Sequence, residues 1–353
     1  MQIICGKYNN ILLNDNKIYV CGDNSYGQLG LGDKYDRHMY EMVKYKFGNI
    51  VQVRCADYHS MIMTDNKGQN ELYVCGNNFF GQLGLNDNVE RNQYIKLENN
   101  FGVITNFQCC NCKNIILNSK NELYISGDTN NLYDHPYNRF IYNKINHKYG
   151  KIIDIIVNNT KMDYVIINDQ NDIFIYNKKI NFKFGKIKQL VYNDRYSMLL
   201  NDKNELYYYK YDVNHMLIDD NNIIRYTKFN IFFENIIQIF IKSDVFIISN
   251  HVNDNLYIYS VELNDLIYIR EKPLFVRINI CIDNIVNIIF NDIIDIIIND
   301  NDGENGLHVR GSNNNGQLGF GDTLTRNIYE KINLDFIVRN YKFRFTYDEQ
   351  IVL

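Results

Sequence analysis

Hydrophobic and polar residues recur along this chain in a unit of eleven residues, which reads as strand sequence interrupted by a turn. The clearest copies of the unit are residues 3–13 and 53–63. Apolar residues alternate with other residues inside each copy, and the side chains of a β-strand point alternately to its two faces. We therefore expect strands that pack on both faces. Further copies occupy residues 107–117, 157–167, 190–200, 239–249, 288–298 and, at the end of the chain, 343–353.

A second strand follows seven of these units after a short polar gap. Residues 18–22, 72–76 and 123–127 show this strand most clearly. The gap holds turn-forming residues, such as Asn14, Asp15 and Asn16, and such gaps are typical of hairpin loops between antiparallel strands. Weaker copies of the second strand lie at residues 173–176, 206–209, 256–259 and 307–311.

The period of the repeat predicts the architecture. Successive units start on average about 50 residues apart, which is the size of a propeller blade of about four short strands. Seven copies of the second strand therefore predict an all-β fold: a seven-bladed β-propeller of mostly four-stranded antiparallel blades, closed by terminal strands. We expect the shorter fourth repeat to lack its loop and its outer strand. The predicted single domain over residues 1–353 has repeats at 1–49, 50–102, 103–150, 151–185, 186–234, 235–283 and 284–336, with 337–353 as the closing strand segment.

A glycine-rich stretch leaves the second strand at residues 21–33, 75–87 and 311–322. The glycine that ends the strand permits a positive φ or a close backbone approach. The leucine of Gly-Gln-Leu-Gly is expected to fill the wedge between blades, and an aspartate with an arginine four residues later is expected to tie the loop to a neighbour. We interpret the stretch as a structural blade connector. Its residues are Gly22, Gly27, Gln28, Leu29, Gly30, Asp33 and Arg37, then Gly76, Gly81, Gln82, Leu83, Gly84, Asp87 and Arg91, and last Gly311, Gly316, Gln317, Leu318, Gly319, Asp322 and Arg326.

Composition and charge limit the kinds of partner. The chain of 353 residues has a formal net charge of −4 and no basic run longer than Lys178-Lys179, so we expect no nucleic acid partner. No apolar run reaches the length that spans a membrane, and the N-terminus lacks a signal-peptide pattern. We expect an intracellular monomer, cytoplasmic or nuclear, that is not secreted. Abundant Asn, Ile, Lys and Tyr are typical of AT-rich coding DNA, as in a protist or a large DNA virus, whose host cell would then be the location.

The eight cysteines follow the repeat. Cys5, Cys55 and Cys109 fall at one position of the unit, and Cys21 and Cys75 fall at another. Small buried residues within strands account for this placement, so we predict reduced core thiols. The cluster at residues 109–112 has no second cysteine pair and no histidine at zinc spacing, so we expect no metal and no cofactor.

These motifs resemble the Regulator of Chromosome Condensation (RCC) repeat family. The resemblance rests on the eleven-residue unit, the Leu-Tyr-Val-x-Gly strand and the Gly-Gln-Leu-Gly-Leu-Gly-Asp loop, and it is strongest in residues 1–97 and 284–332. It implies a seven-bladed propeller. The founding member is an exchange factor for the small GTPase Ran that docks on nucleosomes, and other members are interaction domains. The chain departs from the family in lacking tryptophan and a basic N-terminal tail.

The resemblance also suggests partner-binding residues, because acidic and histidine residues in the turns of the exchange factor face its GTPase. The matching positions here are Asp57, His59 and Asp194. No Ser/His/Asp set and no phosphate-binding loop is present, so we expect a protein that is not an enzyme. The leading hypothesis is a protein–protein interaction propeller. One alternative is a guanine nucleotide exchange factor for a Ran-like small GTPase, and another is a structural component of a viral particle.

Overall fold

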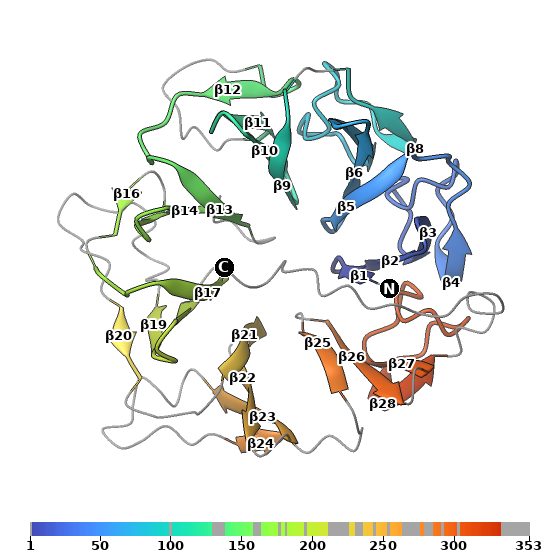
Figure 1. Cartoon of the computed structure of the whole chain (residues 1–353). Helices are drawn as coiled ribbons and strands as arrows, with labels where there is room; N and C mark the ends of the chain where they lie inside the picture. Colours follow the sequence, from blue (N-terminus) through green and yellow to red (C-terminus); the bar gives the residue numbers. More distant parts are fainter. Residues whose placement is uncertain are drawn as a thin grey trace. The chain divides into compact units, whose positions relative to one another are not determined.

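The computed structural model describes residues 2–98, 101–128, 138–157, 164–175, 178–180, 182–193, 196–210, 226–229, 236–242, 245–252, 255–262, 276–278, 285–290, 293–301 and 304–332. The chain falls into two compact units. The first contains residues 1–150, 293–296 and 302–346, and the second contains residues 151–292, 297–301 and 347–353. Each unit consists of antiparallel sheets (Figure 1).

Three complete sheets lie in the first unit. Sheet 1 contains β1 (Gln2–Cys5), β2 (Asn9–Asn14), β3 (Lys17–Gly22) and β4 (Arg37–Met42). Sheet 2 contains β5 (Asn49–Cys55), β6 (His59–Asn66), β7 (Gln69–Gly76) and β8 (Arg91–Lys96). Sheet 3 contains β9 (Ile104–Cys110), β10 (Lys113–Asn118), β11 (Leu123–Gly127) and β12 (Asn143–Ile145).

Four more sheets follow along the chain. Sheet 4 contains β13 (Ile152–Ile156), β14 (Val165–Asn168), β15 (Ile173–Ile175) and β16 (Lys178–Lys179). Sheet 5 contains β17 (Ile187–Tyr192), β18 (Tyr196–Asn201), β19 (Leu206–Lys210) and β20 (Thr227–Lys228). Sheet 6 contains β21 (Ile236–Lys242), β22 (Val245–Val252), β23 (Asn255–Glu262) and β24 (Val276–Ile278). Sheet 7 contains β25 (Ile285–Phe290), β26 (Ile294–Asn301), β27 (Glu304–Gly311) and β28 (Arg326–Ile332).

Every sheet is a meander in which strands that follow one another in sequence also pair, which is the architecture of a propeller blade. The eleven-residue unit folds as the first two strands and their turn. In sheet 1, for example, Ile3 of β1 pairs with Leu12 of β2. Each predicted second strand is the third strand of a sheet, from β3 to β27. The predicted all-β propeller fold with four-stranded antiparallel blades is therefore confirmed.

The hydrophobic core of the first unit lies between consecutive sheets. Ile11 and Val20 of sheet 1 pack with Val53 and Ile62 of sheet 2, and none of the four exposes more than 1% of its surface. Met61 and Val74 of sheet 2 belong to a second cluster, with residues of sheet 3. Both faces of the middle strands are thus buried, as the apolar alternation predicted.

The fourth repeat keeps its outer strand, so the expectation that this strand is missing was wrong. β16 pairs with β15 through Phe174 with Lys179 and Ile175 with Lys178. Both lysines are exposed, and Lys179 Nζ lies 2.6 Å from Asp172 Oδ2. A two-residue edge strand without a buried side chain has no apolar pattern, so the sequence could not reveal it. The eighth copy of the unit and the closing segment 337–353 lie outside the described residues.

Four of the described cysteines, Cys21, Cys75, Cys109 and Cys110, are buried as the repeat predicted, whereas Cys5, Cys55 and Cys112 are only partly buried. All seven in the described part of the chain are free thiols. Burial raises the pKa of Cys21 and of Cys75 to about 12, so neither thiol ionises near neutral pH. Their equivalent positions at the ends of β3 and β7 make them structural residues.

Gly76, at the end of β7, should tolerate substitution much less than Gly68 in the preceding turn. Both have positive φ, +104° and +84°. A Cβ atom on Gly76 would lie 2.4 Å from the carbonyl oxygen of Tyr58, whereas one on Gly68 would meet no atom within 4 Å. We expect Gly68→Ala to lower the free energy of unfolding by about 1–2 kcal/mol through backbone strain. Gly76→Ala should cost about 1–3 kcal/mol more through overpacking. Urea denaturation measures both, and equal losses would show that the close approach is unimportant.

Candidate interaction surface

The antiparallel order of the strands brings two kinds of loop to the same end of each sheet. The turn between the first and second strands and the loop between the third and fourth strands both lie at this end, because successive strands reverse direction. We call it the connector face of the first unit. It consists of turns 6–8, 56–58 and 111–112 and of connectors 23–36, 77–90 and 312–325, which are named connectors 1, 2 and 3.

A buried asparagine organises each connector. Asn24 is completely buried, its Nδ2 donates a hydrogen bond to the backbone oxygen of Asp33 at 3.0 Å, and its Oδ1 accepts one from the backbone N–H of Leu29 at 3.0 Å. Asn78 and Asn313 make the same two bonds in their connectors. Sequence reasoning missed these residues, although an asparagine stands two positions after the strand-ending glycine in all three copies.

The predicted aspartate–arginine pair is present in each connector. Arg37 Nη2 lies 2.6 Å from Asp33 Oδ2, and the corresponding distance from Arg326 to Asp322 is 2.7 Å. The hydrogen bond from the arginine holds the pKa of both carboxyls below its usual value. The arginine is the first residue of the strand that follows the connector, so the pair stays within one repeat and does not reach a neighbouring sheet. Arg91 and Asp87 form the third pair, at 2.5 Å.

The Gly-Gln-Leu-Gly turn anchors each connector on the next sheet. Ser60 Oγ of β6 donates to the backbone oxygen of Gln28 at 2.8 Å. Leu29, which is fully buried, packs into the core with sheet 2. Connector 2 docks on sheet 3 in the same way, and connector 3 docks on sheet 1. Their equivalent hydrogen bonds run from Asn114 Nδ2 to the Gln82 oxygen at 2.8 Å and from Asn10 Nδ2 to the Gln317 oxygen at 2.7 Å.

The glycines of the Gly-Gln-Leu-Gly turn allow the connector backbone to lie directly against the next sheet. A Cβ on Gly30 would lie 2.3 Å from the ring of Tyr94, and one on Gly84 would lie 2.4 Å from the ring of Tyr142. Side chains at these positions would therefore push the connector off the next sheet. The same close approach occurs at the other turn glycines, which are Gly27, Gly81, Gly316 and Gly319.

In each connector the residue two positions after the aspartate is apolar and exposed, and we call it the tip of the connector. Tyr35 is 77% exposed, Val89 56% and Leu324 66%. The backbone on both sides of this tip is held. The aspartate accepts a hydrogen bond from the N–H of the tip residue, and the arginine donates one to its carbonyl oxygen. In each of the three connectors, hydrogen bonds thus hold the backbone of the tip residue, while most of its apolar side chain is exposed to solvent.

Aromatic side chains form a second feature of the connector face. The ring of Tyr58 lies 5.8 Å from that of Tyr8 and 5.3 Å from that of Tyr26, measured between centroids. Burial, followed by the nearby Tyr8 and Asp57, raises the pKa of Tyr58 to about 12, so its phenol remains neutral. Connector 2 carries the pair Phe79 and Phe80, with centroids 5.1 Å apart.

Two of the three predicted partner-binding residues are buried. His59 has no exposed surface, and its Nε2 lies 2.7 Å from Asn114 Oδ1 of sheet 3. Asp57 is 3% exposed, and its Oδ2 accepts a hydrogen bond from Asn111 Nδ2 at 2.9 Å. Both side chains therefore join sheet 2 to sheet 3 and offer almost no surface to a partner. Asp194 lies outside the described residues.

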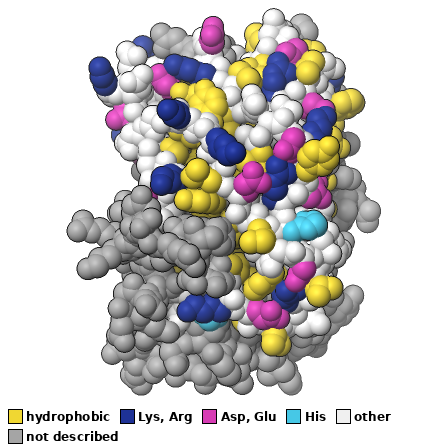
Figure 2. Space-filling view, turned by 90° about the vertical axis from the view of Figure 1, so that its right-hand side faces the viewer, with side chains coloured by type: hydrophobic (Ala, Val, Ile, Leu, Met, Phe, Trp, Pro, Cys, Tyr) yellow, Lys and Arg dark blue, Asp and Glu magenta, His cyan; other side chains and the backbone are white. Residues whose placement is uncertain are grey.

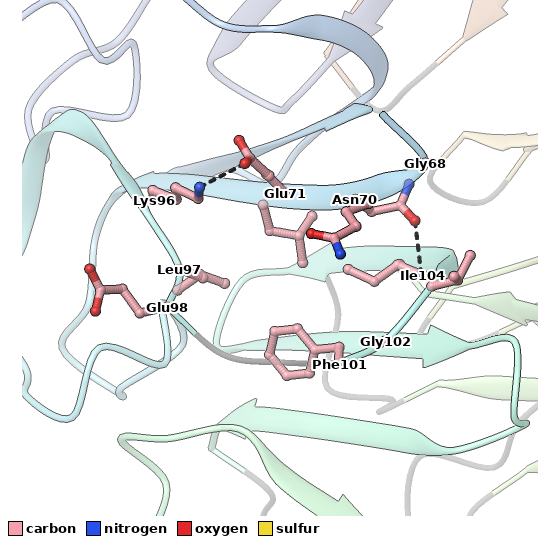
Figure 3. Close-up of a pocket in the computed structure, with 12 residues that line it drawn as sticks. Gly68, Asn70, Glu71, Lys96, Leu97, Glu98, Phe101, Gly102 and Ile104 are labelled. Atoms are coloured by element: carbon pink, nitrogen blue, oxygen red, sulfur yellow. Dashed lines mark hydrogen bonds and ion pairs between the residues drawn. The ribbon is translucent and has the colours of Figure 1, made fainter. Parts of the chain in front are cut away.

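The opposite end of the sheets, the hairpin face, holds a pocket of about 410 Å³ between sheets 2 and 3 (Figure 3). The long β6–β7 hairpin forms one wall, and Phe101 and Ile104 lie on the other side. Two pairs of its polar groups bind each other. Lys96 Nζ lies 2.7 Å from Glu71, and Asn70 Oδ1 accepts a hydrogen bond from the N–H of Ile104 at 3.1 Å.

Glu71 belongs to a repeated network that sequence reasoning also missed. Hydrogen bonds from Lys96, Asn66 and Tyr73 lower the pKa of this carboxyl to about 2. Glu122 and Glu205 have equivalent lysine, asparagine and tyrosine partners. The signal in the sequence is the tetrapeptide Asn-Glu-Leu-Tyr, which occurs at residues 70–73, 121–124 and 204–207. These glutamates secure hairpins and are not available to a ligand.

The described residues contain no group of three or more His, Cys, Asp or Glu side chains that could hold a metal ion. They also contain no helix with the length and apolar character that crossing a bilayer requires.

Comparison with known proteins places the repeat in a family. Residues 15–63 match the Regulator of chromosome condensation (RCC1) repeat. The human X-linked retinitis pigmentosa GTPase regulator is 35% identical over 96 residues, which are 27% of this chain and 9% of that protein. The human RCC1-like G exchanging factor-like protein is 36% identical over 91 residues, which are 24% of this chain and 19% of that protein. The matches thus span less than a fifth of either relative.

Among solved structures, Prp20p from Saccharomyces cerevisiae, described together with its binding properties to Gsp1p and histones, is 13% identical with a TM-score of 0.48. The alignment covers 94% of this chain and 76% of that one. The chain therefore carries the Regulator of chromosome condensation (RCC1) repeat and has RCC1-like proteins as relatives, which confirms the resemblance seen in its sequence.

Proposed function

We propose that this chain is a non-enzymatic protein–protein interaction module that binds its partner through the connector face. The observation that carries the proposal is the exposed apolar tip that all three described connectors share. Exposing an apolar side chain of this size gives a monomer no stability, whereas burying it against a partner is favourable. Hydrogen bonds on both sides of each tip hold it in place before binding, which reduces the entropy that binding must overcome.

The surface around the tips suits a protein partner. Figure 2 shows hydrophobic side chains interspersed with Lys, Arg, Asp and Glu side chains on the side of the molecule that lies to the right in Figure 1, where β4 and β8 are found. Mixed apolar and charged surfaces are usual in non-obligate protein interfaces, whereas a nucleic acid partner would require a basic face. We therefore propose no nucleic acid partner. The free thiols of the seven cysteines that the structure describes are in keeping with a cytoplasmic or nuclear location, and we propose a monomer.

We further infer that the seven sheets are the blades of one closed seven-bladed ring within a single domain. The support is the docking of connector 3, which leaves sheet 7, on sheet 1, where Phe320 forms a β-bridge with Met39. An experimentally determined structure of the full chain tests this inference. An open arrangement of the sheets would overturn it.

The proposed interaction is tested by affinity capture from the native cells. The variant carries Tyr35→Ser, Val89→Ser and Leu324→Ser, and we expect it to lose the partner that the unmodified chain captures. The control variant carries Met42→Ser, Val51→Ser and Val103→Ser, which change exposed apolar residues at the hairpin end of the sheets. It should keep the partner. Equal capture by all three proteins would exclude the connector tips as the binding surface.

A second candidate function is guanine nucleotide exchange on a Ran-like small GTPase. The observation in its favour is the 36% identity over 91 residues to the RCC1-like G exchanging factor-like protein. Exchange would require tighter binding to the nucleotide-free GTPase than to the loaded form, without covalent chemistry. Release of a fluorescent nucleotide from Ran measures it directly. No acceleration by micromolar concentrations of this protein would exclude the activity.

A further inference from the structure

Connector 1 differs from the other two connectors in its charge. Two carboxylates, Asp23 and Asp36, bind the backbone and side chains at its base. Asp23 Oδ2 accepts a hydrogen bond from Gln28 Nε2 at 2.6 Å, and Asp36 Oδ1 accepts one from the N–H of Asn24 at 2.8 Å. Connector 2 has Asn77 and Glu90 at these positions, and connector 3 has Ser312 and Thr325.

The two carboxylates lie close enough to affect each other. Burial and the neighbouring Asp23 raise the pKa of Asp36, and a hydrogen bond to the backbone of Asn24 partly offsets this. An interaction with His38 acts in the opposite direction and lowers the pKa of Asp36 slightly. In the part of the chain that the structure describes, neither carboxylate forms an ion pair with a lysine or arginine.

The basic side chains near Asp36 in the sequence, Lys34 of connector 1 and Arg37 of β4, are engaged elsewhere. Lys34 pairs with Glu90 of connector 2. Arg37 pairs with Asp33 and with Glu41 of β4. The base of connector 1 therefore carries negative charge that its own cations do not neutralise.

The aromatic cluster adjoins these carboxylates. Gln28 links the two features, because its Oε1 accepts a hydrogen bond from the N–H of Tyr26 at 3.0 Å while its Nε2 donates to Asp23. The ring of Tyr26 is 37% exposed and lies against Tyr58, which in turn lies near Tyr8. Lys7 Nζ already lies 5.1 Å from the centroid of the Tyr8 ring, so a cation is compatible with this cluster.

We propose that the surface formed by Tyr8, Tyr26, Tyr58 and the exposed Asp36, together with the negative charge of the buried Asp23, binds an arginine-rich segment of a partner protein. A guanidinium group can stack on a tyrosine ring while it donates two parallel hydrogen bonds to a carboxylate. The flat guanidinium fits this combination better than the ammonium group of lysine, which is compact and strongly hydrated. Connector 2 has exposed phenylalanines but lacks the carboxylate pair, so it provides an internal comparison.

The inference rests on the proposed interaction function and names the chemistry of the partner. Its test uses the full chain and a fluorescein-labelled peptide of alternating arginine and glycine, with fluorescence anisotropy as the measurement. A peptide with citrulline in place of each arginine is the probe control, because citrulline keeps the planar group and loses the charge. We expect the arginine peptide to bind and the citrulline peptide to bind far less.

Three variants then locate the site. Tyr26→Ser and Asp36→Asn should each weaken binding of the arginine peptide by about 2- to 30-fold, the range of a cation–π contact or a charge-assisted hydrogen bond. Phe79→Ser, which removes a 64% exposed ring from connector 2, should leave the affinity unchanged. Circular dichroism establishes that each variant is folded.

The outcomes separate this inference from the general proposal. No binding of the arginine peptide, equal binding of both peptides, or equal loss in Phe79→Ser and Tyr26→Ser would overturn the arginine site. In any of those cases, capture of a partner that depends on the three apolar tips would still support the interaction function. If the Tyr26 and Asp36 variants weaken peptide binding while the tip variant does not, the arginine site stands independently of the tips.

Discussion

Replacing Leu83 by alanine is expected to lower the free energy of unfolding by about 2–5 kcal/mol, the range observed for buried leucines. Leu83 comes from connector 2, is fully buried and packs in the cluster that holds Met61 of sheet 2 and Phe107 of sheet 3. Truncation would leave a cavity at the place where the connector joins two sheets. Since the backbone of Gln82 is held on the next sheet by Asn114 and Ser126, the surroundings have little freedom to close that cavity.

Val89→Ala is the matched control for this prediction. Val89 lies in the same connector, but 56% of its surface is exposed, so its truncation should change the free energy of unfolding by no more than about 0.5 kcal/mol. Urea unfolding followed by circular dichroism measures both variants. Similar losses for the two would mean that the connector is not anchored through its leucine.

Acidification is expected to destabilise the protein between about pH 6.5 and pH 4 through His59. Burial lowers the pKa of this imidazole to about 4 in the folded state, and the bond with Asn114 offsets only part of that shift. The pKa in the unfolded chain is about 6.5. The folded state therefore stays neutral in a range where the unfolded state takes up a proton. Stability is complete above about pH 6.5 and falls as the pH decreases, by about 3 kcal/mol in total at 1.36 kcal/mol per pH unit.

The measurement is the free energy of unfolding as a function of pH for the unmodified chain and for His59→Gln. The variant should lose the hydrogen-bond geometry with Asn114 at every pH, but its stability should vary less between pH 6.5 and pH 4. His38→Gln, which removes an exposed histidine of β4, is the control and should keep the slope. If the free energy of unfolding of His59→Gln depends on pH as strongly as that of the unmodified chain, the buried imidazole does not cause this dependence.

The sequence was most informative where structure repeats. Gly22, Leu29, Asp33 and their counterparts recur at fixed spacing, and the structure places them in connectors with the same hydrogen bonds. The asparagine at the centre of the connector was missed because asparagine is common in this chain and typical of turns in general. Its role depends on an oxygen and an amide group that bind two distant backbone positions, which only the folded loop brings together.

The candidate site was less predictable than the fold. The eleven-residue unit indicated that Asp57 and His59 lie in a turn, and a polar turn residue is normally exposed. The structure buries both because Asn111 and Asn114 of the next sheet cover them. The partners in these two contacts are 54 and 55 positions apart in the chain, so the residues around Asp57 and His59 in the sequence give no indication of the contacts. The exposed tips were likewise undetected, because an apolar residue after an aspartate gives no indication of its solvent exposure.

The sequence by itself determined the strands, the hairpins and the repeated connector, since each depends on alternation and spacing within about 50 residues. Tertiary structure alone decided which side chains of those loops face solvent. Exposure depends on the adjacent sheet, which covers His59 and leaves Tyr26 and Tyr35 open. The buried asparagine, glutamine and leucine of the connector therefore stabilise the fold. The few side chains that the next sheet does not cover are the ones that a partner can contact.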